Sequence, residues 1–144
     1  MARRIIPDVV RNQRLVALAP SNNVREAARF MQHRNVGAVL VMDGEKLCGI
    51  FTERDMVGRV VADGLDPDIT PLSQVMTANP VTVPPNELAP AALRMMDDKG
   101  FRHLPVVENG RVVGIVSRRD FSGVEKAEEE AAQMPDDRRV TAIR

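Results

Sequence analysis

Several features that would define a functional class are missing from this sequence of 144 residues. It contains one cysteine, Cys48, which excludes an internal disulfide framework. Its 20 basic and 20 acidic side chains give a formal net charge of zero, so the chain lacks the positive footprint of a general nucleic-acid binder. No apolar run reaches the length of a signal peptide core or a membrane span. We therefore expect a cytoplasmic protein with neither a nucleic-acid nor a membrane partner.

Motifs that carry catalysis or metal binding are also missing. The sequence has no Cys/His spacing typical of a metal site, no nucleophile elbow and no glycine-rich loop that would hold a phosphate. The 44% apolar and 28% charged residues are the ordinary balance of a folded domain, and the length is sufficient to bury a core. The chain is therefore predicted to be a binding or interaction protein without catalytic residues, not an enzyme.

What the sequence does contain is an internal repeat. When it is shifted by 65 residues, Val10 aligns with Val75 and Asp55 with Asp120 without a gap, and 11 of the 46 aligned pairs are identical. Self-similarity at a fixed spacing indicates a duplicated structural unit. The predicted divisions are a first repeat with its lead-in at 1–66, a second repeat at 67–132 and a flexible C-terminal tail at 133–144.

Each repeat has the pattern of a β-α-β-β-α unit. In the first repeat, apolar residues at helical spacing over 24–31 predict a helix, and the segment Pro20–Asn22 has suitable N-cap chemistry. Strands are expected at 36–42 and 47–51, joined by an Asp-Gly turn typical of a hairpin. A further helix is expected to open at Thr52.

The second repeat shows the same order of elements. Its helix is predicted from the stripe Leu88, Ala92, Met95 and Met96, with Pro90 in the first turns, where a missing N–H costs least. Strands at 101–107 and 112–116 flank an Asn-Gly turn, and the last helix is expected to open at Ser117. One unit is too small to bury its apolar faces alone. The expected fold is therefore mixed α/β (α+β), with two β-α-β-β-α repeats packed with pseudo-twofold symmetry.

Several segments of the second repeat carry a family resemblance. They are Val75 to Thr77 (VMT), Pro80 to Val83 (PVTV), Leu104 to Val107 (LPVV) and Gly114 to Asp120 (GIVSRRD), and the first repeat carries Gly49 to Asp55 (GIFTERD). With them the sequence resembles a tandem pair of cystathionine-β-synthase (CBS) domains, the Bateman module. The resemblance covers most of the chain, from about Val10 to Asp120. It departs from the pattern at Leu40, which stands where the second repeat has Pro105.

The two Thr/Ser-x-x-Asp motifs allow two interpretations that are compatible with each other. Thr52 with Asp55, and Ser117 with Asp120, can form helix capping boxes, in which hydroxyl and carboxylate satisfy each other's backbone N–H groups. An ionised aspartate can also accept two hydrogen bonds from a ribose diol, and a helix N-terminus favours an anionic group. In proteins of the family that this chain resembles, these residues hold the ribose and phosphate of adenosine nucleotides.

The resemblance implies that each ligand cleft combines the Thr/Ser and Asp of one repeat with strand residues of the other. The first cleft would use Thr52, Asp55, Thr77, Asn79, Val81, Phe101, Arg102, His103 and Arg119. The second cleft would use Ser117, Asp120, Asn12, Arg14, Val16, Val36, Gly37, Ala38 and Arg54. Since Arg102 and His103 stand where the second cleft has Gly37 and Ala38, we expect the first cleft to favour ligands with more phosphates.

Two classes of function stay open. The favoured one is a regulatory module that binds AMP, ADP or ATP and transmits a change of conformation to an unidentified regulated protein; NAD and S-adenosylmethionine are alternative ligands. The other is a structural dimerisation module with degenerate clefts. A piece of a larger enzyme, such as an IMP dehydrogenase insert, is disfavoured because no catalytic domain flanks the repeats.

Some side chains are expected to have only a structural role. Cys48 aligns with a core position and is expected to be a small buried hydrophobe, and Glu125–Glu130 to form a solvated helical face. The apolar sides of four helices, including the helix after Thr52, are expected to be only partly covered, which predicts a homodimer formed through the helices of the repeats. On the helix after Thr52 these apolar residues are Met56, Val57, Val60 and Val61.

Overall fold

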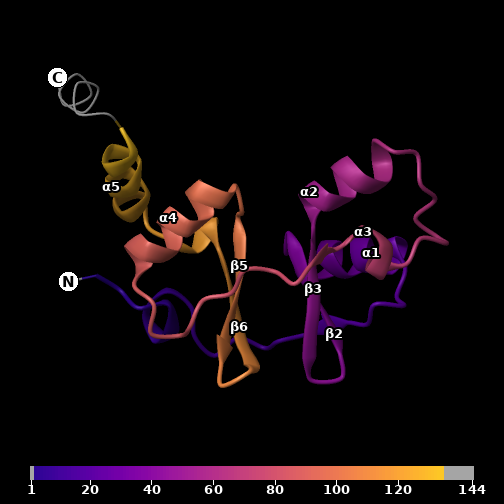
Figure 1. The fold of residues 1–144 in the computed structure, drawn as a ribbon, viewed down its shortest axis with the longest axis horizontal. Helices are drawn as coiled ribbons and strands as arrows, with labels where there is room; N and C mark the ends of the chain where they lie inside the picture. The colour runs from indigo at the N-terminus through magenta and orange to yellow at the C-terminus, as the bar shows by residue number, and fades with distance from the viewer. Residues whose placement is uncertain (1, 135–144) are drawn as a thin grey trace. The chain divides into compact units, whose positions relative to one another are not determined.

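The computed structural model describes residues 2–134 of the chain. Contacts within the chain separate two compact units (Figure 1). Unit 1 takes Met1–Gln13, Thr82–Glu108 and Val113–Arg144, and unit 2 takes Arg14–Val81 and Asn109–Val112. Helices and strands are both abundant in the chain, so the predicted mixed α/β (α+β) fold is confirmed. The part of the predicted tail from residue 135 onward lies outside the described residues.

Unit 2 is built on a four-stranded sheet. Its strands are β1 (Ala17–Leu18), β2 (Ala38–Asp43), β3 (Lys46–Thr52) and β4 (Thr77–Ala78), in the order β1-β2-β3-β4. The pair β1 and β2 is parallel, and the other two pairs are antiparallel. The predicted hairpin is present, with Gly44 at φ 61° in its turn, a conformation that glycine adopts without steric cost.

The helices of unit 2 begin and end where local chemistry directs. They are α1 (Val24–Arg34), α2 (Glu53–Asp55), which continues into the wider turn η2 (Met56–Val61), and α3 (Leu72–Val75). The N-cap of α1 is Asn23, just beyond the predicted cap segment, and its side chain forms a capping box with Glu26. The core of this unit consists of Val24, Ala27, Met31, Val39, Val41, Phe51, Val60, Leu72 and Val75.

Unit 1 repeats the hairpin and the helix before it. Its elements are η1 (Ile5–Val9), α4 (Ala89–Lys99), β5 (His103–Glu108), η3 (Arg118–Asp120), α5 (Gly123–Gln133) and the part of β6 (Arg111–Ser117) from Val113 onward. The hairpin turn and the start of β6, residues 109–112, are assigned to unit 2. Pro90 lies in the first turn of α4, as predicted, and Gly100 ends that helix at φ 72°. Asn109 and Gly110 both have positive φ in the predicted hairpin turn.

Two predictions about the helices of unit 1 were wrong in detail. Leu88 precedes α4 and is exposed, whereas the buried face of the helix consists of Ala89, Ala92, Leu93 and Met96. The helix at Ser117 is a single 3₁₀ turn, because Phe121 is extended and almost fully buried. Ser122 then provides a second N-cap, and its capping box with Glu125 starts α5.

The acidic face of α5 is not simply solvated, which corrects the expectation for Glu125–Glu130. Glu125 pairs with Arg3 at 2.6 Å. Glu129 is almost fully buried and lies 3.7 Å from the guanidinium of Arg94. Hydrogen bonds from Arg3, assisted by Ser122, lower the pKa of the Glu125 carboxyl to about 2. Cys48 also differs from expectation, because it is partly exposed rather than buried.

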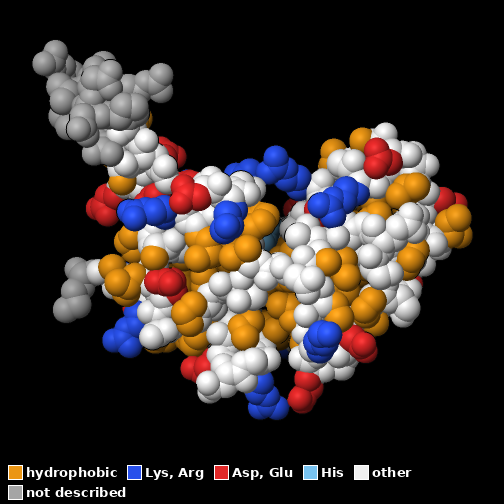
Figure 2. All heavy atoms as spheres, viewed as in Figure 1, with side chains coloured by type: hydrophobic (Ala, Val, Ile, Leu, Met, Phe, Trp, Pro, Cys, Tyr) orange, Lys and Arg blue, Asp and Glu red, His pale blue; other side chains and the backbone are white. Residues whose placement is uncertain are grey.

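The surface carries charges of both signs. On the face drawn in Figure 2, acidic and basic side chains are interspersed, in keeping with the formal net charge of zero. Within residues 2–134, no helix combines the length and hydropathy needed to cross a membrane. Over the same residues, no three His, Cys, Asp or Glu side chains gather as metal ligands would.

Candidate functional site

The end of β3 presents the first Thr/Ser-x-x-Asp motif. Thr52 pairs with Ala38 in the sheet, and the N–H of Glu53 donates to the carbonyl of Gly37 at 3.0 Å. The N–H of Asp55 donates to Thr52 Oγ1 at 3.1 Å, and the N–H of Thr52 donates to Asp55 Oδ2 at 3.0 Å. This is the predicted capping box, and it fixes the Asp55 carboxylate at the start of the helical turn.

A third side chain reaches this carboxylate from much later in the sequence. Strand β4 pairs with β3 and places the Thr77 hydroxyl 3.2 Å from Asp55 Oδ1 and 3.4 Å from Oδ2. The approach is close, since a Cβ added to Gly49 would lie 2.8 Å from the carbonyl oxygen of Thr77. Thr52, Asp55 and Thr77 therefore form one hydrogen-bonded cluster within unit 2.

The cluster leaves acceptor capacity on the Asp55 carboxylate. An ionised carboxylate offers about four acceptor positions. Among the described residues, the N–H of Thr52 and the hydroxyl of Thr77 take two of them, while Arg59 lies at ion-pair distance, 3.8 Å from Oδ1. The remaining two equal the number of donors in a vicinal ribose diol. Because the Asp55 side chain is only 12% exposed, few of its orientations are open, and such a diol would meet a carboxylate that is already held in place.

The other predicted members of the first cleft lie in both units. Asn79 and Val81 are in unit 2, where the N–H of Asn79 donates to the carbonyl of Cys48 at 3.1 Å. Phe101, Arg102, His103 and Arg119 are in unit 1. The structure thus places Thr52, Asp55, Thr77, Asn79 and Val81 in one unit. The complete first cleft stays a prediction.

The second motif has similar local geometry in unit 1. The N–H of Ser117 donates to Asp120 Oδ2 at 2.8 Å, and the Ser117 hydroxyl approaches the same oxygen at 3.2 Å. Arg118 donates its N–H to the carbonyl of Arg102 at 2.8 Å, as Glu53 does to Gly37 in unit 2. The guanidinium of Arg118 pairs with Asp97 at 2.6 Å.

The chain segment beside β6 contains Gln13, and it is held to that strand by the side chain of Gln13 and not by β-strand pairing. The Gln13 amide accepts from the N–H of Ile115 at 2.9 Å and donates to its carbonyl at 2.8 Å. The neighbouring residue, Asn12, belongs to unit 1, as Ser117 and Asp120 do. The remaining predicted residues of the second cleft are in unit 2, and this cleft also stays a prediction; they are Arg14, Val16, Val36, Gly37, Ala38 and Arg54.

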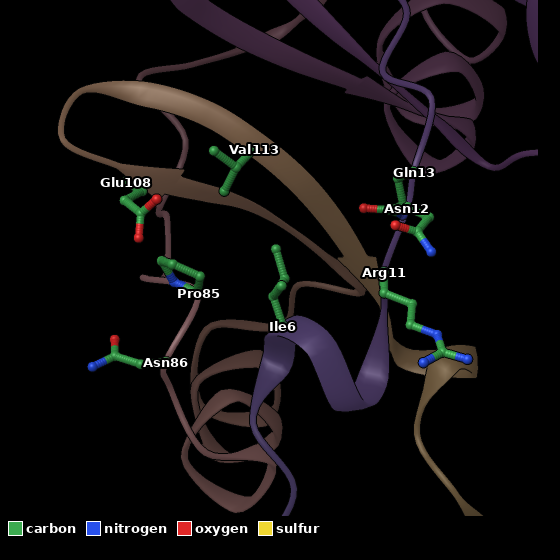
Figure 3. Close-up of a pocket in the computed structure, with 8 residues that line it drawn as sticks. All are labelled: Ile6, Arg11, Asn12, Gln13, Pro85, Asn86, Glu108 and Val113. Carbon is green, nitrogen blue, oxygen red and sulfur yellow. The ribbon is translucent and has the colours of Figure 1, made fainter.

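Unit 1 also contains a cavity of about 450 Å³ (Figure 3). Its lining includes Val113, which lies four residues before Ser117 on β6, a separation of about 13 Å along a strand. Neither Ser117 nor Asp120 is among the residues that line the cavity, although Asn12 belongs to both its lining and the predicted second cleft. The lining residues are Ile6, Arg11, Asn12, Gln13, Pro85, Asn86, Glu108 and Val113.

One residue beside the Asp55 carboxylate was not among the predicted site residues. Arg59 lies one helical turn after Asp55, with its Nε 3.8 Å from Asp55 Oδ1. A basic residue four positions after an acidic one on a helix is a pattern that could have identified this pair. The expectation for that helix was based on its apolar residues alone.

Solved structures of known proteins resemble the chain over most of its length. One is the CBS domain protein PAE2072 from Pyrobaculum aerophilum, complexed with AMP, with a TM-score of 0.77 and 27% identity over 89% of this chain and 98% of that one. Another is a hexameric CBS-CP12 protein from bloom-forming cyanobacteria, with a TM-score of 0.77 and 25% identity over 99% of this chain and 89% of that one.

Sequence comparisons agree with the structural ones. The CBS domain-containing protein CBSCBSPB2 of Arabidopsis thaliana is 39% identical over 127 residues, which are 86% of this chain. The chain spans about a quarter of the length of that relative. The family model described as "CBS domain" matches twice, at residues 6–62 and 72–125. The chain therefore belongs to the CBS domain family and carries the domain as a tandem pair.

Proposed function

We propose that the protein is a regulatory module that binds adenine nucleotides through the carboxylates of Asp55 and Asp120. The observation that supports this most is the Asp55 cluster, in which two acceptor positions remain on a carboxylate held by Thr52 and Thr77. A structure with the same fold is complexed with AMP, which favours an adenosine ligand for this chain as well. Each site would use the aspartate for the ribose and the hydroxyl of Thr52 or Ser117, whose hydrogen can rotate, for phosphate.

The ligand would act by shifting a conformational equilibrium. A nucleotide that contacts residues of both repeats binds best to one relative arrangement of them, and its binding energy stabilises that arrangement in proportion to the difference in affinity. A regulated protein would then recognise the favoured arrangement. In this proposal the protein performs no chemistry on the nucleotide.

The two sites would differ in their preference for phosphates. Arg102 and His103 belong to the proposed first site, where the second has Gly37 and Ala38. Charge-assisted hydrogen bonds to phosphate are about twice as strong as neutral ones, so ATP and ADP should gain more at the first site. NAD and S-adenosylmethionine share the adenosine group and are the alternative ligands to compare.

The test is calorimetric titration with AMP, ADP, ATP, NAD and S-adenosylmethionine. Asp55→Ala should cost about 1.5–3 kcal/mol at its site, and Asp120→Ala a similar amount at the other, because each loses two hydrogen bonds to ribose. That corresponds to roughly 10- to 150-fold weaker binding. Asp68→Ala is the matched control, since Asp68 is an aspartate of unit 2 whose ion pair with Arg25 is separate from the cluster.

Two results would contradict the proposal. Parent-like affinity in the double variant Asp55→Ala, Asp120→Ala would show that the carboxylates do not bind ribose. Absence of binding in the parent protein would favour the structural dimerisation module. For the phosphate preference, Arg102→Ala with His103→Ala should weaken ATP at one site per chain and leave adenosine nearly unchanged. Equal losses for both ligands would remove that assignment.

A further inference from the structure

The side chain of Arg59 links three parts of unit 2. Its Nε lies 3.8 Å from Asp55 Oδ1. Its Nη1 donates to the carbonyl of Met76 at 2.9 Å and to that of Val75 at 3.3 Å. These two carbonyls immediately precede β4, the strand that carries Thr77. Arg59 therefore connects the carboxylate of the proposed ribose site to the chain that supplies the site's third side chain.

The contacts of Arg59 are better suited to orienting the Asp55 carboxylate than to neutralising its charge alone. A guanidinium is planar and presents its donors in a rigid fork, so donors used on two carbonyls fix the position of the group as a whole. The charged edge is then held at ion-pair distance from Asp55 Oδ1, while Oδ2 accepts the N–H of Thr52. Held from both oxygens, the carboxylate has little freedom to rotate.

The second repeat does not reproduce this arrangement. After Asp55 the helical turn continues through η2 and brings Arg59 back beside it. After Asp120 the helical turn ends, and Phe121 is extended. Residue 124, which aligns with Arg59, is a valine in the separate helix α5, and the hydrogen bonds described above for the Asp120 carboxylate both come from Ser117.

We propose that Arg59 is a positioning residue of the Asp55 site, and that it makes this site the tighter of the two for the ribose of a nucleotide. The inference rests on the proposed function. Arg59 orients the carboxylate and the segment bearing Thr77 before the ligand arrives, so binding loses less side-chain freedom there. A residue that acts through orientation affects adenosine and ATP alike. A residue that binds phosphate affects ATP far more.

The experiment compares Arg59→Ala with the parent in an Asp120→Ala background, which isolates the Asp55 site. Affinities for adenosine, AMP and ATP should each fall by a similar factor of about 3–10, since the lost orientation concerns the ribose that all three share. The preference for AMP over 2′-deoxy-AMP should shrink by about the same factor. Arg25→Ala is the matched control, because Arg25 is a similarly exposed arginine of unit 2 that pairs with Asp68.

The outcomes separate this inference from the proposed function. Unchanged affinity in Arg59→Ala, or an unchanged preference for AMP over 2′-deoxy-AMP, would overturn the positioning role. A loss confined to ATP would overturn it too, because Arg59 would then be a phosphate ligand. If Arg59→Ala folds poorly, Arg59→Lys keeps the charge without the fork, and the same reduction of the deoxyribose ratio is expected. Failure of the parent protein to bind any adenosine ligand would instead refute the proposed function.

Discussion

Alanine substitutions at the two aligned glycines should have unequal effects on stability. Gly49 and Gly114 occupy the same position of the duplicated motif, and both are buried in a strand. Gly49 lies beside Met76 and Thr77, and Gly114 lies beside Gln13 and Ile6. A Cβ on Gly49 would lie 2.6 Å from the Met76 sulfur and 2.8 Å from the backbone oxygen of Thr77. A Cβ on Gly114 would meet Gln13 Oε1 at 2.8 Å and Ile6 Cδ1 at 3.4 Å.

The nature of the clashing atom determines the cost. The Thr77 oxygen belongs to a strand paired with β3, so Gly49→Ala must displace backbone, and overpacking of this kind costs about 2–3 kcal/mol. The Gln13 amide is the end of a flexible side chain. It can move away at the cost of its two exposed hydrogen bonds to Ile115, so Gly114→Ala should cost about 1 kcal/mol or less. The entropy that alanine removes from the unfolded chain is similar at both positions and cancels in the comparison.

Urea unfolding followed by circular dichroism measures the difference. We expect a lower midpoint for Gly49→Ala than for Gly114→Ala, with the same slope, because the surface exposed on unfolding does not change. Gly49→Ala should also weaken nucleotide binding at the Asp55 site, since it displaces the strand that carries Thr77. Equal midpoints, or a larger loss in Gly114→Ala, would refute the reasoning from backbone and side-chain clashes.

Two further predictions concern α5 and the assembly. The folded pKa of Glu125, about 2, lies below its ordinary 4.5, so the stability gained from Arg3 is present above pH 4.5 and disappears as the pH falls toward 2. The free energy of unfolding of Glu125→Gln should therefore be about 1 kcal/mol lower than that of the parent at pH 7, because solvent screens the part-exposed pair, and the two should be equal near pH 2. A difference that stays constant across this pH range would contradict a stabilising ion pair. Of the four residues expected on the uncovered side of the helix after Thr52, Val60 is buried in the core of unit 2 and Met56 packs partly buried against that core, which corrects the expectation for these two. Val57 and Val61 are 65% and 70% exposed on η2, and we expect a homodimer that Val57→Glu with Val61→Glu converts to monomer in light scattering. The predicted interface would be refuted if the parent protein is monomeric at tens of micromolar. It would also be refuted if the parent forms an assembly that the double substitution leaves intact.

The local features of the fold were predictable because they depend on neighbours in sequence. Pro90 in a first turn, the Asn-Gly hairpin and the capping box of Thr52 each satisfy backbone groups within a few residues. Where the local signal was ambiguous, the prediction failed. The sequence shows acceptable N-cap residues at both Ser117 and Ser122, and burial of Phe121 between them decides that the long helix starts at the second.

The composition of each site was harder to predict than its motif. The motif identifies Asp55, but Arg59 enters the cluster only because the helical turn continues and because the carbonyls of Val75 and Met76 accept its donors. Glu129 shows the same limit. In sequence it belongs to an acidic run typical of a solvated face, and its burial depends on Arg94 from another helix. The partners of these charged residues are set by tertiary contacts, and the periodicity of the sequence does not specify such contacts.

The way in which the chain is divided between the units has a consequence for the proposed sites. Unit 2 ends its long segment at Val81 and so includes β4, although the alignment by 65 residues places that strand in the second repeat. Unit 1 includes residues 1–13, which the predicted division assigns to the first repeat and its lead-in. A cut between residues 66 and 67 would follow the predicted repeat boundary but would separate Asp55 from Thr77 and remove the carbonyls that hold Arg59. The Asp55 cluster therefore requires residues from both copies of the duplicated sequence, so neither repeat alone contains its complete set of contacts.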